Sequence, residues 1–369
     1  MKILYLSYIN SDKQFIGIKK KISEQVSAIE LLGNEVHFTF IEDNEFYYFD
    51  GSDKRLINSF KNKHNIKFNK YKNLFNFITI NKIECIYMRY PLFDWSFIKF
   101  AKKLNNKQIK IFIEIPTFPY DNELTFKWRS IDRFFRRFIH KYVTTIVISS
   151  VKKEKIFGIN TIFTDNCVNS KNIKFLNRCF DNNVINMIAV SYIRKTNGYD
   201  RIIEGLKDYY KKGGQRLINI NFIGNGEEVQ FLNDLVKQYN LEDKIKFIGS
   251  KIGSELDHYF DNADLAIGSL ADHRDNIFSK APLKSREYCA RGIPFISAIE
   301  DPGFLNSEEF ILRFPSNDQP IDIEKVIRFY DNLKGKDISN KMRKYALENF
   351  DWVKQYSKIE YFKNTKKIL

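Results

Sequence analysis

The feature that most constrains the fold is an alternation of strand-like and helix-like segments, which runs through the chain twice. Short apolar runs of strand length are each followed by a segment with helical spacing. Such an alternation is typical of a parallel, doubly wound sheet with helices on both faces. The predicted strands are 2–9, 35–41, 85–89, 109–115 and 144–149 in the first series, and 187–192, 218–223, 245–249, 265–269 and 295–298 in the second. The sequence therefore predicts an α/β protein with two Rossmann-like domains.

The helices and the linker set the predicted domain boundaries. Residues 150–185 are rich in Lys and Asn and read as the linker, so the domains are predicted at 1–165 and 166–349. Residues 42–77 are weakly periodic and are interpreted as insertions plus a helix. The predicted helices are 19–32, 95–104, 128–142, 199–211, 227–239, 255–260, a short one between Pro282 and Gly292, 323–333 and 338–369, the last broken at 350–352.

The charge indicates an anionic partner. The 369 residues carry a net charge of +15, which suits nucleic acid, an anionic membrane surface or phosphorylated small molecules. A genomic bias toward Lys would also explain scattered lysines. No zinc-finger spacing, RNP-type motif or helix-turn-helix is evident, so nucleic acid is disfavoured as a partner.

Several other classes of protein are disfavoured by what the sequence lacks. The four cysteines and five histidines are scattered without ligand spacing, so no metal site, disulfide framework or cofactor is predicted. No GxGxxG follows the first strand, which argues against a nicotinamide or flavin enzyme. No apolar run reaches the roughly 18 to 20 residues that span a bilayer, and the N-terminus shows no cleavage site, so a cytoplasmic protein is expected.

The most informative motif is the segment from Pro282 to Ile296. Pro282 can start a helix, Gly292 can stop it, and Pro294 precedes an apolar strand. This helix carries Glu287, a carboxylate that can accept both hydroxyls of a ribose, while the unpaired amides at its N-terminus favour an anion. The alternative is a surface glutamate on an ordinary helix. The pattern Glu-x-x-Ala-x-Gly-x-Pro resembles the donor-binding segment of glycosyltransferase family 4.

This resemblance extends over nearly the whole chain and implies a GT-B fold. It implies an active site in a cleft between the two domains, with a C-terminal helix, 350–369, crossing back to the first domain. It also implies retention of the anomeric configuration without a metal ion. Glu287 would hold the ribose, and Lys284, with the amides near Ser285 and Arg286, would face the diphosphate.

The chain departs from the family at three donor-binding positions. The first of the two glutamates that define the family is Ser279, and the cations expected to bind the diphosphate are replaced by Tyr192 and Asn197. Residues that can substitute lie in the same loops, namely His273 and Arg274 as further catalytic candidates and Arg194 and Lys195 as cations. The other donor-binding candidates are loop residues that resemble family segments, with ordinary strand-to-helix turns as the alternative: Gly17, Gly198, Gly224, Gly249, Ser250, Lys251 and Ile252.

Acceptor-side residues are expected after the strand at 109–115, where a proline-rich segment should form a loop over the cleft. Its polar candidates are Glu114, Thr117, Tyr120, Asp121 and Glu123. The helix predicted at 128–142 has an aromatic stripe and an arginine-rich opposite side. It can either pack on the sheet or lie on the anionic inner face of a cell membrane.

Taken together, the residues and the resemblance predict a retaining, metal-independent glycosyltransferase. The donor would be a nucleotide-sugar, with a UDP-sugar favoured, and the acceptor a lipid-linked compound or saccharide in bacterial surface polysaccharide synthesis. Two alternatives stay open. A nucleotide-sugar epimerase would use the same cleft without an acceptor, and a non-catalytic GT-B partner protein would explain Ser279, Tyr192 and Asn197.

Overall fold

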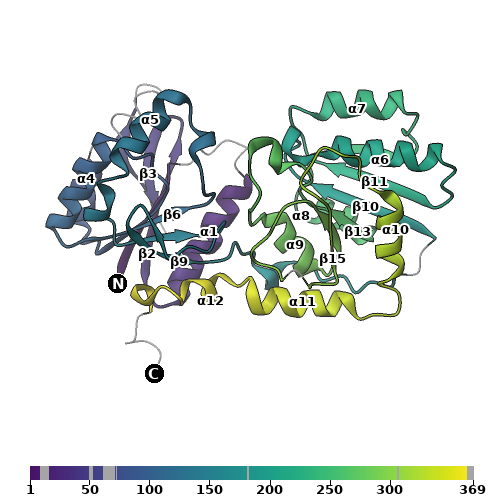
Figure 1. The fold of residues 1–369 in the computed structure, drawn as a ribbon. Coiled ribbons are helices and arrows are strands. Elements are labelled where there is room, and N and C mark those ends of the chain that lie inside the picture. The colour runs from purple at the N-terminus through teal and green to yellow at the C-terminus, as the bar shows by residue number, and fades with distance from the viewer. Residues whose placement is uncertain are drawn as a thin grey trace. The chain divides into compact units, whose positions relative to one another are not determined.

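The chain divides into two compact units. The computed structural model describes residues 1–8, 16–49, 53–60, 71, 73–180, 183–305 and 307–363. Unit 1 comprises Met1–Asp165 and Trp352–Leu369, and unit 2 comprises Asn166–Asp351 (Figure 1). The chain thus leaves unit 1 once and returns to it near its C-terminal end.

Unit 1 is built on a nine-stranded sheet in the order β4-β3-β2-β1-β5-β6-β7-β9-β8. The strands from β2 to β9 in this order pair in parallel, while β3, β4 and β8 pair antiparallel at the two edges. The central strands are near-continuous apolar runs because both of their faces are covered. The bounds are β1 (Lys2–Leu6), β2 (Glu35–Glu42), β3 (Glu45–Phe49), β4 (Lys54–Ser59), β5 (Cys85–Arg89), β6 (Lys110–Ile115), β7 (Thr145–Ile148), β8 (Lys155–Ile156) and β9 (Ile159–Phe163).

Helices cover both faces of this sheet. On one face α1 packs against α12, and the indole of Trp352 donates to Glu24 (3.4 Å). On the other face α3 and α4 pack on an apolar core, and Asp94 caps α4 by accepting from the amide of Phe97 (2.8 Å). The bounds are α1 (Ile16–Leu31), α3 (Leu74–Ile80), α4 (Trp95–Asn106), η2 (Asp121–Glu123), α5 (Phe126–Phe135), η3 (Ile139–Lys141), α12 (Trp352–Tyr356) and η7 (Glu360–Phe362).

Unit 2 has a six-stranded, wholly parallel sheet in the order β12-β11-β10-β13-β14-β15. This is the strand order of a dinucleotide-binding Rossmann sheet. Its strands are β10 (Val184–Val190), β11 (Leu217–Ile223), β12 (Ile245–Gly249), β13 (Leu265–Ile267), β14 (Phe295–Ser297) and β15 (Ile311–Arg313). Its helices are α6 (Tyr199–Lys211), α7 (Val229–Gln238), α8 (Gly253–Asp261), α9 (Leu283–Arg291), α10 (Ile323–Asp331) and α11 (Ile338–Asn349), with the short turns η4 (Ser170–Asn172), η5 (Lys195–Asn197) and η6 (Asp272–Asp275).

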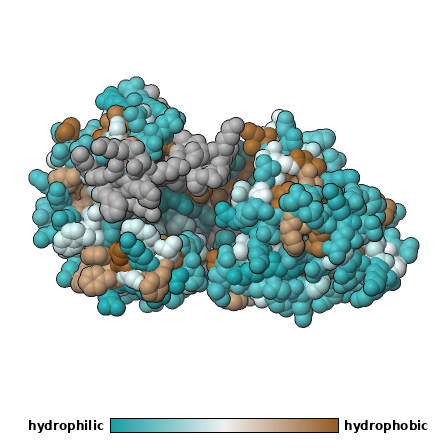
Figure 2. Space-filling view, turned by 90° about the horizontal axis from the view of Figure 1, so that it is seen from above, coloured by the Kyte–Doolittle hydropathy of each residue, from teal (hydrophilic) through white to brown (hydrophobic). Residues whose placement is uncertain are grey.

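The structure corrects four of the sequence predictions. Residues 45–49 and 54–59 form the β3–β4 pair instead of an insertion, and part of the predicted linker forms β9 in the sheet of unit 1. The helix predicted at 128–142 ends at Phe135. The helix predicted at 350–369 is a short helix followed by a 3-10 turn, and residues 364–369 lie outside the described part of the chain. The outer face seen in Figure 2 is mostly hydrophilic, with apolar residues in small separate groups.

Candidate active site

The strand order of unit 2 reverses between β10 and β13, which is where parallel sheets bind ligands at their carboxyl ends. The loops that follow these two strands are bonded to each other. The amide of Leu270 donates to the carbonyl of Asn197 (3.0 Å), and that of Ala271 donates to Thr196 (3.2 Å). The candidate site is therefore a rigid backbone platform.

Glycines make this platform compact. Gly198 has φ 67°, and a Cβ there would lie 2.7 Å from the Cβ of Ala271. A Cβ on Gly224 would lie 1.8 Å from the carbonyl oxygen of Ser191. The amide of Gly224 donates to the carbonyl of Gly249 (2.9 Å). A cavity of about 440 Å³ opens beside Gly224 and Gly249. These glycines are thus required by close backbone contacts, whatever ligand they face.

Helix α9 places Lys284 at this platform. The helix starts and stops as the sequence predicts, after Pro282 and at Gly292, which has φ 79°. No side chain caps its N-terminus. The ammonium of Lys284 is buried 5.8 Å from the ring centroid of Tyr199, and among the described residues no acceptor bonds to it.

The electrostatics of Lys284 follow from this burial. Desolvation lowers the pKa of Lys284 to about 8, the nearby carboxylate of Asp272 opposes the shift, and Lys280 adds to it. Asp272 is itself buried and pairs with Lys280 through Oδ1 (3.2 Å), while its Oδ2 has no hydrogen-bond partner in the described structure. An anionic ligand would supply the bonds that Lys284 lacks.

Glu287 lies one turn after Lys284 and is held by Arg291. Arg291 donates to Oε1 of Glu287 from Nη2 (2.9 Å) and Nε (3.2 Å), and it also pairs with Asp257 of α8 (2.7 Å). Both bonds go to the same oxygen. Among the described residues none bonds to Oε2 of Glu287, which stays available to a ligand hydroxyl.

Arg274 and His273 are engaged in the structure of unit 2. Arg274 forms a bidentate pair with Asp200 (3.0 and 2.6 Å) and bonds to Asp318 (2.7 Å) and the carbonyl of Lys195 (2.9 Å). His273 also faces Asp318 (3.3 Å). These contacts join η6 to α6 and to the loop that carries Asp318, and no local sequence pattern predicts this pairing.

The remaining donor-side candidates separate into exposed and buried residues. Arg194 and Lys195 are exposed in the loop after β10. Ser250, Lys251 and Ile252 lead into α8, where Lys251 pairs with Glu255 (3.1 Å). Ser279 forms a parallel bridge with Glu300.

Two candidates of α9 are buried, Ser285 and Arg286. The guanidinium of Arg286 pairs with Asp301, donates to the carbonyl of Asn166 (3.0 Å) and lies against the rings of Phe304 and Phe350. The side chain of Arg286 is therefore part of the core of unit 2 and is not exposed to a diphosphate.

In unit 1, Glu114 is the centre of a buried charge cluster at the end of β6. It pairs with Lys21 (2.8 Å) and Arg89 (3.7 Å) and accepts from Tyr5, Gln25 and Tyr87. Burial would raise the pKa of Glu114, but the charges of Lys21 and Arg89 outweigh it and lower the pKa to about 2. Gly17 lies in the first turn of α1.

One of the other acceptor-side candidates, Tyr120, contacts a buried aspartate that was not predicted as a site residue, Asp132 of α5. Tyr120 donates to Asp132 (2.9 Å) and is buried. Asp121 pairs with Arg133 (2.7 Å) and Arg136 (3.3 Å). Thr117 is half-buried and Glu123 is exposed, so these two are the more accessible candidates.

Within the described ranges, no group of three or more His, Cys, Asp or Glu side chains is placed to hold a metal ion. None of the described helices is both long and apolar enough to cross a membrane.

Known proteins share this fold. Residues 170–307 match the family model of glycosyl transferases group 1. A glycosyltransferase from Rickettsia africae ESF-5 has a TM-score of 0.65 at 14% identity, covering 100% of this chain and 99% of that one. Anabaena Alr3699/HepE in complex with UDP has a TM-score of 0.66 at 13% identity, covering 98% and 99%. The sucrose-phosphate synthase of Thermosynechococcus elongatus has a TM-score of 0.66 at 13% identity, covering 98% of each chain.

These similarities confirm the predicted GT-B fold over the full chain. The family match lies in unit 2 and includes Lys284 and Glu287. No curated protein matches the sequence.

Proposed function

We propose that the protein is a retaining glycosyltransferase of family 4 that uses a UDP-sugar. The family match over the second sheet and the fold shared with a protein solved with UDP support this proposal. The acceptor would be a lipid-linked compound or a saccharide in bacterial surface polysaccharide synthesis. Unit 2 would bind the nucleotide-sugar, and unit 1 the acceptor.

The observation that carries the proposal is the buried ammonium of Lys284 beside the uncapped N-terminus of α9. A buried cation without a partner is unfavourable unless a ligand pairs with it. The N-terminus of α9, which no side chain caps, adds backbone amides and a positive dipole at the same place. The amide of Ser285 is already bonded to the carbonyl of Pro282 (3.2 Å). A diphosphate matches both requirements, and Oε2 of Glu287, one turn further on, would accept a ribose hydroxyl.

In the proposed reaction the site contributes electrostatic stabilisation of the leaving group. During transfer the bond from the anomeric carbon to the UDP oxygen breaks, a bond from that carbon to the acceptor oxygen forms, and the proton of the acceptor hydroxyl would pass to the departing phosphate oxygen. Lys284 and the α9 amides would stabilise the charge that develops on the leaving diphosphate. A protein cation supplies this charge, so the proposed mechanism needs no metal ion.

Calorimetric titration with UDP tests the proposal. Lys284→Met should weaken UDP binding about ten- to hundredfold, because a charge-assisted contact to phosphate is lost. Lys325→Met is the matched control, since Lys325 is an exposed lysine on α10 of the same unit. Equal affinities of the wild type and Lys284→Met for UDP would exclude this site.

A non-catalytic GT-B partner protein is the second candidate. It is favoured by the absence of a cation at two expected positions: Tyr192 is 52% exposed, and Asn197 accepts from the amide of Arg194 (2.7 Å). Binding of UDP without release of sugar from any UDP-sugar, with or without acceptor lipids, would support this candidate over the transferase.

We also propose that α5 brings unit 1 to an anionic membrane. Phe126 is 83% exposed and Phe134 53% exposed, and Lys127 and Arg137 are basic residues near them. Arg133 and Arg136, two of the arginines of the predicted basic helix, pair with Asp121, so their charges are partly neutralised within the protein.

Cosedimentation with vesicles tests this second part of the proposal. The protein should bind vesicles of anionic lipid and not zwitterionic ones, and Phe126→Ser should weaken binding. Phe231→Ser is the control, because Phe231 is 52% exposed on α7 of unit 2. Equal losses in the two variants would contradict a membrane contact through α5.

A further inference from the structure

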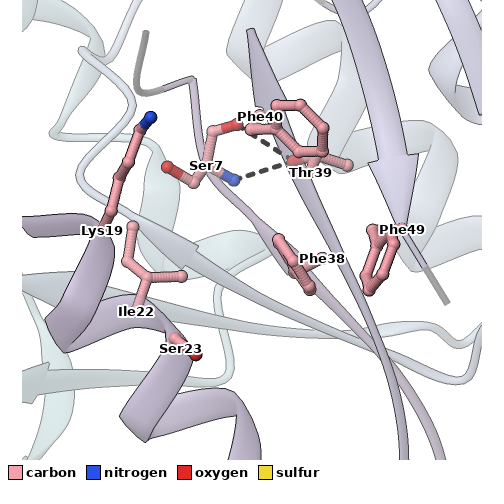
Figure 3. Close-up of a pocket in the computed structure, with 8 residues that line it drawn as sticks. All are labelled: Ser7, Lys19, Ile22, Ser23, Phe38, Thr39, Phe40 and Phe49. Atoms are coloured by element: carbon pink, nitrogen blue, oxygen red, sulfur yellow. Dashed lines mark hydrogen bonds between the residues drawn. The ribbon is translucent and has the colours of Figure 1, made fainter. Parts of the chain in front are cut away.

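Unit 1 contains an apolar cavity that none of the predicted site residues lines. It has a volume of about 370 Å³ and lies between α1 and the strands β2 and β3. Figure 3 shows Ile22 and Ser23 on α1, with Phe38 of β2 and Phe49 of β3 across the cavity. We call it the aromatic pocket. Its volume falls within the roughly 300–1,000 Å³ of small-molecule sites.

The sheet register explains why the aromatic rings gather here. Phe38 and Phe40 are two residues apart on β2 and share one face, and Phe49 of β3 is the partner of Phe38. The ring centroids of Phe38 and Phe49 lie 5.3 Å apart, and those of Phe38 and Phe40 6.1 Å apart. All three rings stay half-buried. Part of each apolar ring is thus left for a ligand to cover.

Three of the four polar residues that line the aromatic pocket, Ser7, Lys19 and Thr39, gather at one end of it, and Ser23 lies apart on α1 (Figure 3). Ser7, which follows β1, and Thr39 bond to each other through the amide of Ser7 (2.9 Å) and the carbonyl of Ser7 (3.0 Å). The side chain of Lys19, in the first part of α1, lies beside Ser7 (Figure 3). A cation therefore stands at the carboxyl end of β1, the edge where parallel sheets bind ligands.

We propose that the aromatic pocket binds the apolar chain of an anionic amphiphile, the lipid-linked acceptor of the proposed transferase. A saccharide fits the pocket less well, because most of its exposed lining is apolar and offers few hydrogen-bond partners for a ring of hydroxyls. An alkyl or isoprenoid chain gains from the same surface, and Lys19 matches a phosphate at the head of the chain. The inference rests on the proposed function and selects a lipid over a saccharide as acceptor.

Calorimetry with decyl phosphate, below its aggregation concentration, tests the pocket on the full chain. Ser23→Trp places a large side chain at the pocket and should weaken binding at least tenfold. Ser27→Trp is the matched control, because Ser27 is also exposed on α1, one turn away, and does not line the pocket. Shortening the chain by one methylene should weaken binding up to about fourfold. Equal affinities of Ser23→Trp and Ser27→Trp for decyl phosphate would overturn the proposal.

The head group is tested separately. Lys19→Ala should weaken binding of decyl phosphate and leave binding of decanol unchanged, whereas Lys20→Ala, at an exposed neighbouring position, should change neither. If decanol binds as tightly as decyl phosphate to the wild type, the anionic head group is wrong. UDP is titrated in parallel: loss of amphiphile binding with UDP binding intact would refute this inference alone, and the reverse result would refute the donor site of the proposed function.

Discussion

Arg291 holds Glu287 by two hydrogen bonds to a single carboxylate oxygen, and the same guanidinium pairs with Asp257 and lies 4.0 Å from the ring centroid of Phe260. The two residues are one helical turn apart on α9. Because Arg291 is buried and bonded on three sides, it fixes the rotamer of Glu287 before any ligand arrives. The proposed ribose contact is therefore preorganised by a residue that the sequence analysis did not select.

Arg291→Lys should weaken UDP binding about five- to tenfold. Lysine keeps the charge but cannot make the forked contact, so the carboxylate of Glu287 gains rotamers that it must lose on binding. Arg328→Lys, at an exposed position of α10, is the control. Calorimetry with UDP measures the effect, and wild-type affinity in Arg291→Lys would show that the orientation of Glu287 is irrelevant to the nucleotide.

Arg286→Met should destabilise unit 2 by about 3–5 kcal/mol, because it leaves Asp301 buried without its partner. The double variant Arg286→Met with Asp301→Asn should recover part of the loss. Denaturant unfolding measures both. The folded fraction of Arg286→Met should bind UDP as the wild type does, and a loss of UDP affinity without a loss of stability would restore Arg286 to the donor site.

The fold could be predicted from the sequence where local pattern and tertiary structure agree. The short helix α9 is bounded by Pro282 and Gly292, and these residues act through backbone geometry alone. The β3–β4 pair is not evident from the sequence, because β3 is a run of aromatic residues and β4 is mostly exposed, so neither strand alternates apolar and polar residues. The last helix was extended too far, because its apolar spacing continues beyond Tyr356 while the chain turns into η7.

The site was predictable only in part, because its side chains are joined by contacts distant in sequence. Arg274 meets Asp318, and Arg286 meets Asp301, through the packing of separate loops. Nothing in the local sequence separates a buried arginine from one that faces a phosphate. Lys284, by contrast, lies on the motif itself and was found from it.

Gly198→Ala should destabilise unit 2 by more than Gly213→Ala. Both glycines have a positive φ, 67° and 86°, so both alanines carry a backbone cost of about 1 kcal/mol. Only at Gly198 would the new Cβ also meet a neighbour, Ala271, whereas nothing lies within 4 Å at Gly213. Comparing the thermal unfolding of the two variants isolates the effect of the contact with Ala271. Equal unfolding midpoints would show that the loops carrying residues 198 and 271 can move apart without loss of stability.

Glu114→Gln should destabilise unit 1 by about 3–5 kcal/mol at pH 7, since Lys21 and Arg89 lose their buried counter-charge. The pKa of Glu114 is lowered to about 2 in the folded protein, so its contribution is complete above about pH 4.3 and is lost as the pH falls toward 2. The difference in the free energy of unfolding between the wild type and Glu114→Gln should decrease as the pH falls over that range. Glu35→Gln, which breaks an exposed pair with Lys2, should cost less than about 1 kcal/mol.

Lys284→Met should bind UDP less tightly and yet unfold at a higher temperature than the wild type. In the folded protein the pKa of Lys284 is lowered to about 8, against about 10.4 in an unfolded chain, because its ammonium is buried. The unfolded state therefore holds more protons between these two pH values, and the stability of the wild type should rise with pH across that window. Below pH 8 the folded wild type keeps a desolvated charge that methionine lacks, so the variant should be about 1–3 kcal/mol more stable there. The difference in the free energy of unfolding between variant and wild type should fall as the pH approaches 10.4.

Denaturant unfolding at pH 7, 9 and 10 measures this trend, with Lys325→Met as the control that should show none of it. A destabilised Lys284→Met at pH 7 would mean that the ammonium is paired in the free protein, and would contradict a phosphate site at Lys284.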